Sequence, residues 1–555
     1  MKNFIFLIVL LLQSIAFAQT YKITYHSYFE GKKRENFDPI IAFVNEKESY
    51  ILSQKILESQ KPVPYEVQRI DRKTQNLHQF AFLKDNHVSQ FIDTAHAGKY
   101  SYTHSAETKE ILGYTCHKAV TNINSNTMEI WYTKELSLKG GPSTLGQELG
   151  LVLEIVRNGN SATRATEITK VKQFQPGTLF GNHNITTHDG LTHRDLIWQS
   201  RFTKIPVFHN ETINFIDNPQ SNDSVYRYAH GTIILRKIQY PNINATDNLF
   251  VELTEQSRGD AYDRTGTVFV ITKDREKSFF HALQQGIDSV PQYQNSNQKV
   301  YKGVVLTSDY TPPTELMRFF TPFGVQHFNH LQIKNKEWHE KVTYRQDITE
   351  LAPLLSNQEL WTGVFIGNYD QGGHEVSLEI TQHQDGINVF KNNFALPIFN
   401  TLNIMEMAGQ DYATMFSSEE GLLVEFTLDQ PLQNAQLRYI TTGHGGWEHG
   451  DEFVPKPNKI SLNEQQITSF IPWRSECGSY RLYNPASGNF HNGLSSSDLS
   501  RSNWCPATAT PPQYIDLGDL PAGKHSIRVQ IPLGEPQGSS FSAWNVSGIL
   551  IGTTG

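Results

Sequence analysis

The chain has 555 residues, more than one hydrophobic core usually holds, so two to four domains are expected. Its formal net charge is −8 and no long basic block is present. Phosphate binding needs a concentrated Lys/Arg surface, so nucleic acid is excluded as an expected partner. Aromatic residues reach 11%, which suits either a strand-rich protein or a surface that stacks on sugar rings.

The first residues have the parts of a secretory signal. Lys2 supplies the positive start, Phe4–Leu12 the apolar run, and 16–18 a small-x-small cleavage site. We therefore expect a signal peptide over residues 1–18 and a secreted or periplasmic mature protein. No later segment is apolar for long enough to span a bilayer, so no membrane partner is expected.

Period-2 alternation of apolar and polar residues is common after the signal, and helical periodicity is scarce. Short alternating runs separated by Pro, Gly and Asn are typical of sandwiches or barrels. The sequence therefore predicts an all-β protein. The clearest runs are Tyr21–Tyr25, Thr267–Ile271, His374–Ile380 and Ser526–Ile531.

Three regions follow the signal. A β-rich N-terminal domain is expected over 19–175, and Gln173–Thr192, rich in Gly, Asn, His and Thr, is interpreted as a linker. Two further domains are expected over 195–384 and 385–555. The sequence shows no short-period repeat.

The three cysteines are Cys116, Cys477 and Cys505. In an oxidising compartment the late two can pair and leave Cys116 alone. Closing that loop would stabilise the fold by about 3–4 kcal/mol. The alternative is three unpaired buried thiols.

The segment Arg258–Gly266 runs directly into an expected strand. It carries two acids, Asp260 and Asp263, with Tyr262 and Arg264 beside them. An Asp next to a guanidinium stays ionised and can orient a substrate N–H or a water. The alternative is a surface turn, for which these residue types are common.

The segment Thr442–Phe453 concentrates reactive groups in a Gly-rich loop. One interpretation is a carboxylate that activates water beside a Trp that stacks on sugar. Another is a metal site, and a third is a plain polar loop. The groups concerned are His444, Trp447, Glu448, His449, Asp451 and Glu452.

The segment Leu499–Pro506 brings Arg501, Trp504 and Cys505 together. If Cys505 is bonded to Cys477, the loop is stiffened, and a fixed Arg and Trp suit hydrogen bonding and stacking on carbohydrate. A disulfide packed on a core Trp is the alternative.

In this order the segments resemble the peptide-N-glycosidase F family. Gly259–Arg264 is similar to the family's Cys-Asp-Glu-Trp-Asp-Arg, and Leu437–His444 to its Leu-Arg-Thr-Thr-Ile-Ser-Gly-Trp. The most specific match is Ser500–Pro506 with Asp-Arg-Ala-Gly-Trp-Cys-Pro. The resemblance covers roughly 195–555 and implies two adjacent eight-stranded antiparallel jelly-roll sandwiches, preceded by the added N-terminal domain.

The resemblance implies a secreted amidase that hydrolyses the bond between N-acetylglucosamine and asparagine in N-linked glycoproteins and glycopeptides. Asp263 and Glu452 fall on the two catalytic acids, and Cys477–Cys505 on a disulfide. No metal or other cofactor is implied, and we expect a monomer. The residues expected to bind substrate are Tyr262, Arg264, His444, Trp447, Arg501 and Trp504.

The sequence departs from the family in one respect that bears on catalysis. Where the family has a third acid, this chain has Phe365; Asp370 and Glu375 lie nearby without a match. A non-catalytic carbohydrate-binding protein is therefore the rival hypothesis. A two-jelly-roll copper hydroxylase would need clustered His and Met ligands, which six Met and scattered His do not provide.

Overall fold

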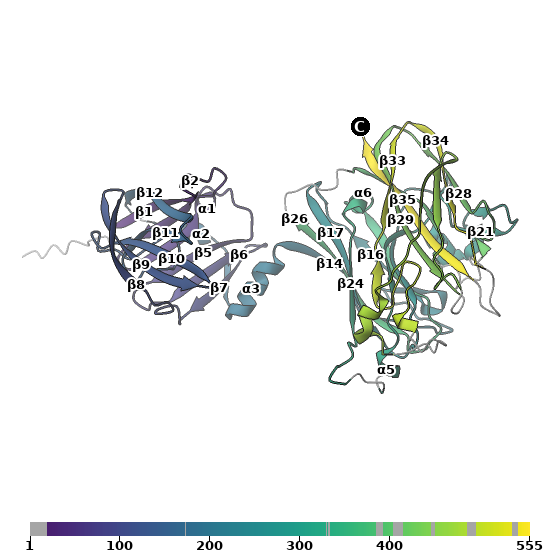
Figure 1. The fold of residues 1–555 in the computed structure, drawn as a ribbon, viewed down its shortest axis with the longest axis horizontal. Coiled ribbons are helices and arrows are strands. Elements are labelled where there is room, and N and C mark those ends of the chain that lie inside the picture. Colours follow the sequence, from purple (N-terminus) through teal and green to yellow (C-terminus); the bar gives the residue numbers. More distant parts are fainter. Residues whose placement is uncertain are drawn as a thin grey trace, which may run out of the picture. The chain divides into compact units, whose positions relative to one another are not determined.

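The structure is a computed structural model that describes residues 19–172, 174–328, 330, 334–384, 392–402, 414–445, 450–485, 496–534 and 542–555. The chain forms two compact units, Met1–Phe202 and Thr203–Gly555 (Figure 1). Strands dominate both units, which confirms the all-β class. Within the described ranges no helix combines the length and hydrophobicity that crossing a bilayer requires. The expected signal peptide lies outside those ranges.

The N-terminal unit is built on one long sheet. In its described residues the strand order is β13-β7-β6-β5-β4-β3-β1-β12-β11-β10-β9-β8, with β2 paired to β1. The strands are β1 (Thr20–Phe29), β2 (Lys32–Lys33), β3 (Ile40–Val44), β4 (Glu48–Ser53), β5 (Tyr65–Asp71), β6 (Leu77–Phe82), β7 (His87–Asp93), β8 (Thr103–Ile111), β9 (Tyr114–Ile123), β10 (Asn126–Thr133), β11 (Leu151–Arg157), β12 (Ser161–Val171) and β13 (Asn184–Thr187). The helices are α1 (Gln54–Leu57), α2 (Gly177–Phe180) and α3 (Gly190–Gln199).

The segment predicted as a linker, Gln173–Thr192, is folded into this unit. Its β13 pairs in parallel with β7. Phe174 stacks on Phe43 with ring centroids 4.0 Å apart, and Phe180 stacks on Phe82 at 5.4 Å. The linker prediction is therefore wrong. The segment is rich in Gly and Asn, but the packing of Phe174 and Phe180 and the pairing of β13 fix it to the N-terminal unit.

The second unit contains two sandwiches (Figure 1). In the first, one sheet has the order β14-β26-β17-β24 and the other β15-β16-β25-β18-β23-β32. These strands are β14 (Phe202–Ile213), β15 (Tyr226–Tyr228), β16 (Ile233–Gln239), β17 (Asp247–Ser257), β18 (Thr265–Ile271), β23 (Thr314–Phe320), β24 (Val342–Asp347), β25 (Glu359–Ile366), β26 (His374–Gln384) and β32 (Thr508–Thr510). Short elements join them: β19 (Lys277–Ser278), β20 (Gln292–Gln294), β21 (Val300–Lys302), β22 (Tyr310–Thr311), α4 (Phe279–Gln285), α5 (Val325–Phe328) and α6 (Ala352–Leu355).

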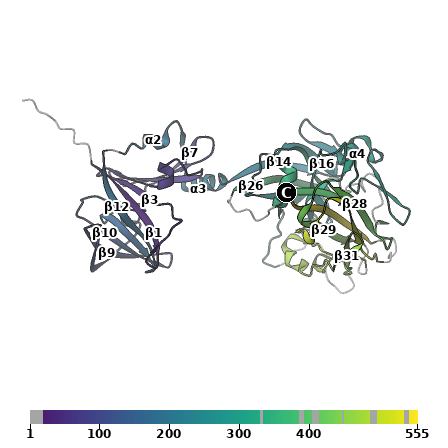
Figure 2. The ribbon, with the colours of Figure 1, turned by 90° about the horizontal axis from the view of Figure 1, so that it is seen from above.

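The second sandwich has sheets of order β27-β35-β29-β33 and β28-β34-β30-β31. Its strands are β27 (Phe394–Asn400), β28 (Leu422–Leu428), β29 (Leu432–His444), β30 (Asn458–Leu462), β31 (Gln465–Phe470), β33 (Gln513–Leu520), β34 (Gly523–Gln530) and β35 (Ala543–Thr554). The prediction of two adjacent antiparallel jelly rolls is confirmed. The second has the eight strands expected, whereas the first has ten among its described residues, because the short strands β15 and β32 extend its second sheet. Strand β32 lies in sequence between β31 and β33 of the second sandwich, but it pairs with β23 of the first. The two sandwiches are therefore also joined by backbone hydrogen bonds between strands. Figure 2 shows β14 and β26 on one side of the unit and β28 and β31 on the other.

Strand β18 is buried on both faces, because the two sandwiches pack against each other. Val268 and Val270 lie in the core of the first sandwich. Phe269 and Ile271, on the opposite face, lie in a cluster that continues into the second sandwich. The loop that precedes β18 is therefore anchored on a strand held from both sides.

Two buried ion pairs also hold the sandwiches together. Arg318 of β23 binds Glu315 through two bonds of 3.0 and 2.8 Å and donates to the carbonyl of Asn545 in β35. Arg438 of β29 binds Glu350 at 2.5 Å and donates to the carbonyls of Glu315 and Leu316. All four charged side chains are fully buried. Buried pairs of this kind fix one arrangement, because separating either partner leaves an uncompensated charge.

Candidate active site

The loop between β17 and β18 carries Asp260 and Asp263. Two neighbouring turns lie in close contact with it. A Cβ on Gly259 would lie 2.9 Å from Oδ1 of Asp370, and a Cβ on Gly324 only 2.1 Å from the carbonyl oxygen of Asp260. The contact at Gly324 is with backbone and requires glycine, and the contact at Gly259 brings the side chain of Asp370 against the loop. These close approaches restrain the loop.

Asp260 organises the loop from within. Its carboxylate is 2% exposed and accepts from Arg264 through Nε at 2.6 Å and Nη2 at 2.9 Å. It also accepts from the backbone N–H of Tyr262 and faces Nε2 of His374. Burial opposes ionisation, but the bonds from His374 and Arg264 hold the pKa of Asp260 well below its usual range. Asp260 is therefore a structural anion.

Asp263 and Glu452 meet at Arg501, although they come from different sandwiches. Nη1 of Arg501 lies 3.2 Å from Oδ2 of Asp263 and forms a second ion pair with Oε1 of Glu452. The carboxyl side chains are 15% and 18% exposed, and the Arg501 side chain only 1%. One buried guanidinium thus bridges two acids that solvent can reach.

Both bridged acids hold protons more strongly than free carboxyl groups. Burial raises the pKa of Glu452 to about 7; Arg501 opposes the shift and the neighbouring Asp263 adds to it. Burial likewise raises the pKa of Asp263, against the pull of Arg501 and Arg264. Because both groups bind protons more strongly than free carboxyl groups and titrate as a pair, the arrangement suits one acid and one base in the same site.

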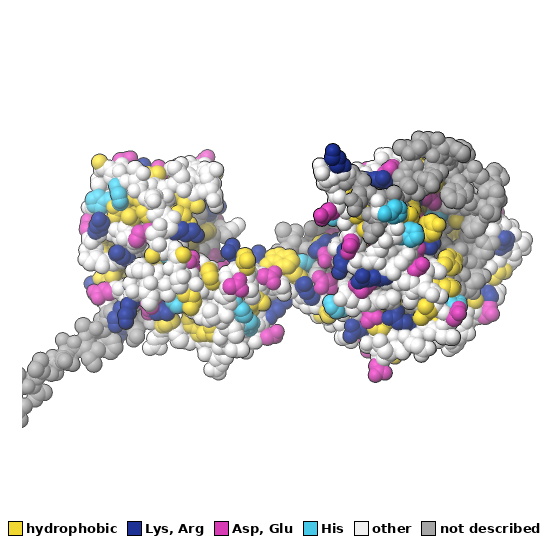
Figure 3. Space-filling view, turned by 90° about the horizontal axis from the view of Figure 1, so that it is seen from below, with side chains coloured by type: hydrophobic (Ala, Val, Ile, Leu, Met, Phe, Trp, Pro, Cys, Tyr) yellow, Lys and Arg dark blue, Asp and Glu magenta, His cyan; other side chains and the backbone are white. Residues whose placement is uncertain are grey.

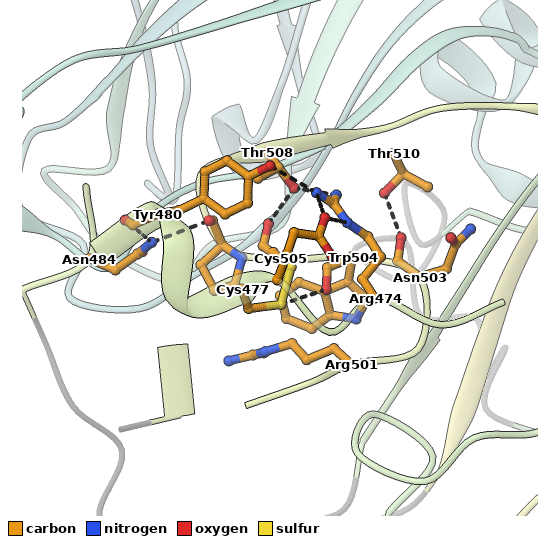
Figure 4. The surroundings of a disulfide bond; sticks show 12 residues. Arg474, Cys477, Tyr480, Asn484, Arg501, Asn503, Trp504, Cys505, Thr508 and Thr510 are labelled. Atoms are coloured by element: carbon orange, nitrogen blue, oxygen red, sulfur yellow. Dashed lines mark hydrogen bonds and ion pairs between the residues drawn. A yellow bond between two sulfur atoms is a disulfide. The ribbon is translucent and has the colours of Figure 1, made fainter. Parts of the chain in front are cut away.

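Arg501 is held by aromatic rings and by the backbone. Its Cζ lies 4.2 Å from the ring centroid of Trp504 and 5.1 Å from that of Phe453. Nη2 donates to the carbonyl of Ser496 at 2.6 Å. Backbone bonds between Arg501 and Arg474 run in both directions at 2.9 Å. Figure 4 shows Arg501 beside the Trp504 ring.

The Cys477–Cys505 disulfide closes this assembly, as predicted, with the Cα atoms 5.1 Å apart. Cys116 is buried and unpaired, and burial raises the pKa of its thiol to about 11. The bridge joins the segment of Arg474 to that of Arg501 and Trp504 (Figure 4). It therefore supports the guanidinium that binds the two acids.

Opening this disulfide has a predicted cost in stability. Cys477→Ser/Cys505→Ser should lower the unfolding free energy of the second unit by about 3–4 kcal/mol, because the unfolded chain regains the freedom of a closed loop. Denaturant titration with and without reductant measures the change. Cys116→Ala is the control, since it keeps the bridge and should keep the wild-type response to reductant. The double variant should show no change in unfolding free energy on adding reductant. If reductant destabilises it as much as wild type, the disulfide assignment is contradicted.

Trp504 lies in the interior and does not offer a free ring. It is 4% exposed, stacks on Phe320 with centroids 4.2 Å apart, and donates from Nε1 to the carbonyl of Gly443. The Trp504 ring is covered by Phe320 and by the guanidinium of Arg501. We propose that Trp504 positions Arg501 and does not touch sugar.

The other residues expected to bind substrate differ in their exposure and in their partners. Tyr262 is 60% exposed and packs on Arg264, which is committed to Asp260. His444 accepts from Thr442 at 2.8 Å, since that hydroxyl receives a bond from Arg318; burial, with Arg318 and Arg501, lowers the pKa of His444 to about 3. His444 is therefore neutral. Trp447, with Glu448 and His449, lies outside the described residues.

Asp451, next to Glu452 in the chain, is bonded within the protein interior. It is fully buried and accepts from the N–H of Gly534 at 3.0 Å and from Nε1 of Trp544 at 2.9 Å. Its carboxylate anchors the loop and leaves Glu452 as the acid directed at Arg501. Within the described part of the chain, no group of three or more His, Cys, Asp or Glu side chains is arranged to hold a metal ion.

No acid replaces the family's third one at its expected place. Phe365 of β25 is 1% exposed and lies in the core. Asp370 accepts from the backbone N–H groups of Gly372 and Gly373, and Glu375 is paired with Arg258 at 2.8 Å. Both acids therefore serve the turns that press on the 258–264 loop.

Two residues of the site's supporting structure were not predicted from the sequence. Glu255 of β17 and His374 of β26 are fully buried and bonded to each other. A signal was present: each occupies the inward position of its alternating strand, where Leu253 and Val376 show the apolar pattern. A charged residue in an inward position indicates a buried partner.

Comparison with known proteins follows this division of the chain. Three family models match: N-glycanase peptide, N-terminal domain, over residues 23–195; peptide-N-glycosidase F, N terminal, over 204–382; and peptide-N-glycosidase F, C terminal, over 411–551. Comparison with curated protein sequences gives no match.

Solved structures give the same result. Two crystal forms of PNGF-II, in space groups C2 and P21, are 55% identical to this chain over 97% of its length; 99% and 100% of the solved chains are covered, with TM-scores of 0.90 and 0.91. PNGase F, described as a glycosylasparaginase from Flavobacterium meningosepticum, is 15% identical, covers 64% of this chain and 97% of its own, and has a TM-score of 0.42.

The fold and site define a protein of two adjacent jelly rolls with a bridged carboxylate pair where they meet. From its identity to PNGF-II over nearly the whole length, the chain belongs to the peptide-N-glycosidase F family. The resemblance drawn from the sequence motifs is thereby confirmed.

Proposed function

We propose that this protein is an amidase that hydrolyses the bond between N-acetylglucosamine and asparagine in N-linked glycoproteins and glycopeptides. It releases the glycan as a glycosylamine and leaves aspartate. Family membership supports a hydrolase that removes N-glycans. The observation that carries the finer assignment is the meeting of Asp263 and Glu452 at one buried guanidinium.

Amide hydrolysis sets three requirements that this site can meet. The attacking water must lose a proton, the carbonyl oxygen must be stabilised as it gains charge, and the departing nitrogen must gain a proton. We assign Glu452 as the base that orients and deprotonates water. Asp263, in its protonated form, orients the sugar-linked nitrogen and protonates it. Arg501, which lies against both carboxyl groups, supplies positive charge beside the reacting carbonyl.

Access to the site is proposed to pass Tyr262, since its ring is the exposed aromatic nearest along the chain to Asp263. Arg264 stiffens this approach because it packs on Tyr262 while bound to Asp260. His444 is proposed as a neutral neighbour of Trp504, with ring centroids 5.5 Å apart. Its role is to fill space behind Arg501.

We propose that the mature protein is exported and acts as a monomer on glycoproteins. Acidic and basic side chains are interspersed on the face shown in Figure 3. Among the described residues on that face there is no concentrated cationic surface of the kind that binds nucleic acid. The N-terminal domain, the two jelly rolls and the boundaries near residues 195 and 385 are proposed as the working division of the chain.

The test is mass spectrometry of a glycopeptide after incubation with the purified full-length protein. An amidase converts the glycosylated asparagine to aspartate, so the peptide product carries that residue change. Recovery of intact glycopeptide in a stable complex would instead support the rival hypothesis of carbohydrate binding, which the absence of an acid at Phe365 favours. Cleavage within the sugar chain would contradict both.

A pH prediction follows from Glu452. Because its carboxyl group must be ionised to act as base, turnover should rise with pH through about 7. Glu452→Gln should lower turnover by about 10²- to 10⁴-fold and remove this rising limb. The matched control is Glu425→Gln on the exposed side of β28, which should behave as wild type. A rising limb that persists in Glu452→Gln would assign the base to another residue.

A further inference from the structure

His374 is the first residue of β26 and lies between two carboxylates from different segments. Its Nδ1 is 2.7 Å from Oε1 of Glu255 in β17, and its Nε2 is 3.3 Å from Oδ2 of Asp260 in the 258–264 loop. The His374 and Glu255 side chains are fully buried and Asp260 is 2% exposed. Both ring nitrogens of His374 therefore face protein carboxyl groups in the interior.

The geometry requires a positive ring. A neutral imidazole has one N–H and one acceptor nitrogen, whereas an imidazolium donates from both nitrogens. A carboxyl oxygen lies at hydrogen-bond distance from each ring nitrogen, so His374 can donate to both only when both nitrogens carry hydrogen. Burial by itself favours the neutral ring, but the bonds to Asp260 and Glu255 raise the pKa of His374 to about 9.

The charges around His374 balance only while it is protonated. Facing it are Glu255 from β17, and Asp260 with its partner Arg264 from the loop. Tyr344 of β24 lies near Glu255; burial and this carboxylate raise its pKa far above the usual range, so it is uncharged. The pair Arg258–Glu375 lies where the loop leaves β17. Loss of the proton from His374 would leave a net negative charge in a closed interior, which is costly.

That charge bears on catalysis because the loop is folded around Asp260. The same carboxylate holds the N–H of Tyr262 and the guanidinium of Arg264. Asp263 lies between these two attachment points. A shift of Asp260 therefore moves Asp263 relative to Arg501, and displacements of about 1 Å can cost about 10²-fold in rate.

We propose that His374 is a positioning residue which, as a buried imidazolium between Glu255 and Asp260, holds the 258–264 loop so that Asp263 meets Arg501. The proposal rests on the proposed function for its effect on turnover, but not for its effect on the loop. Deprotonation of His374 loosens the loop and produces a falling limb at alkaline pH, separate from the rising limb of Glu452.

The experiment compares the pH profile of kcat for glycopeptide hydrolysis in wild type, Glu255→Gln and His374→Gln. Wild type should lose activity as pH rises through about 9. Glu255→Gln removes one of the two anions that favour the charged ring, so its falling limb should move to lower pH. The active pH range then narrows toward the rising limb of Glu452 near pH 7. His374→Gln should lower kcat by about 10²-fold with little change in KM. It should also lose the part of the falling limb that Glu255→Gln shifts, and keep only the limb set by the proton on Asp263.

A second readout does not depend on activity. Amide hydrogen exchange of the 258–264 segment, corrected for intrinsic base catalysis, should increase through the same pH range in wild type and at lower pH in Glu255→Gln. If wild type hydrolyses no glycopeptide but shows this opening, the proposed function fails and the role of His374 in the loop stands.

The control is His525→Gln, at a buried histidine of β34 that donates to the carbonyl of Pro521 and faces no carboxylate within hydrogen-bond distance among the described residues. Its pH profile should match wild type. A falling limb and exchange profile that are unchanged in Glu255→Gln would overturn the proposal, whether or not His374→Gln folds.

Discussion

Arg501→Met should lower kcat by about 10²- to 10³-fold, the loss expected when a fixed charge beside a reacting carbonyl is removed. The methionine is uncharged, so Asp263 and Glu452 lose the cation that favours their ionised forms. The pKa of each should rise further, because repulsion between them is then unopposed. The rising limb of the pH profile should move to higher pH, as measured by kcat and kcat/KM with one glycopeptide across pH.

The control substitution is Arg345→Met on β24, where the guanidinium is 47% exposed and pairs with Glu252 at the surface. Its kinetics should equal wild type. Arg501→Lys should give an intermediate rate, since an ammonium group keeps the charge but cannot stack as a plane between Phe453 and Trp504. If Arg501→Met keeps the wild-type rising limb while remaining folded, Arg501 does not control the protonation of the acids.

The parts of the fold that could be predicted are those governed by alternation. His374–Ile380 lies in β26 with every second residue buried. Tyr21–Tyr25 lies in β1, although Ile23, Thr24 and Tyr25 are all buried there. Thr267–Ile271 was also predicted as a strand, but the sequence did not show that it is buried on both faces. That property depends on the second sandwich, which packs against the sheet from a distant part of the chain.

The acids and arginines of the candidate site could be selected from the sequence, but which of them pair could be seen only in the coordinates. Asp260 and Asp263 both lie near Arg264 along the chain, yet Arg264 is bound to Asp260. Asp263 is paired with Arg501 from the other sandwich. Adjacency along a loop does not determine which carboxylate a long side chain reaches, because the direction of each side chain is set by contacts such as those of Gly259 and Gly324.

Trp504 shows a second limit. A Trp beside an Arg and a Cys suggested a surface for stacking on sugar, while its burial on Phe320 depends on β23. The disulfide joins this segment to Cys477, and both cysteines are buried. The alternative considered from the sequence, a disulfide packed on a core Trp, is the one the structure has.

Asp263→Asn should abolish measurable release of glycans, with a loss of about 10³-fold or more, as is usual when a group that acts directly on the reacting bond is removed. The amide has nearly the same shape and can remain beside Arg501, but it cannot transfer a proton. The measurement is the conversion of asparagine to aspartate in a denatured glycoprotein, followed by mass spectrometry. Asp429→Asn, at an exposed position after β28, is the matched control and should keep full activity.

The same substitution should not weaken the fold, and this distinguishes chemistry from unfolding. Burial raises the pKa of Asp263 above that of the unfolded chain, so the folded protein binds this proton more strongly. Stability from this group therefore increases as pH falls through the raised pKa and is lost above it. The amide introduced by Asp263→Asn carries no charge to desolvate, so the unfolding free energy at neutral to alkaline pH should equal or exceed that of wild type in denaturant titrations. Near-wild-type release by a fully folded variant would show that the amide bond is broken without this carboxyl group.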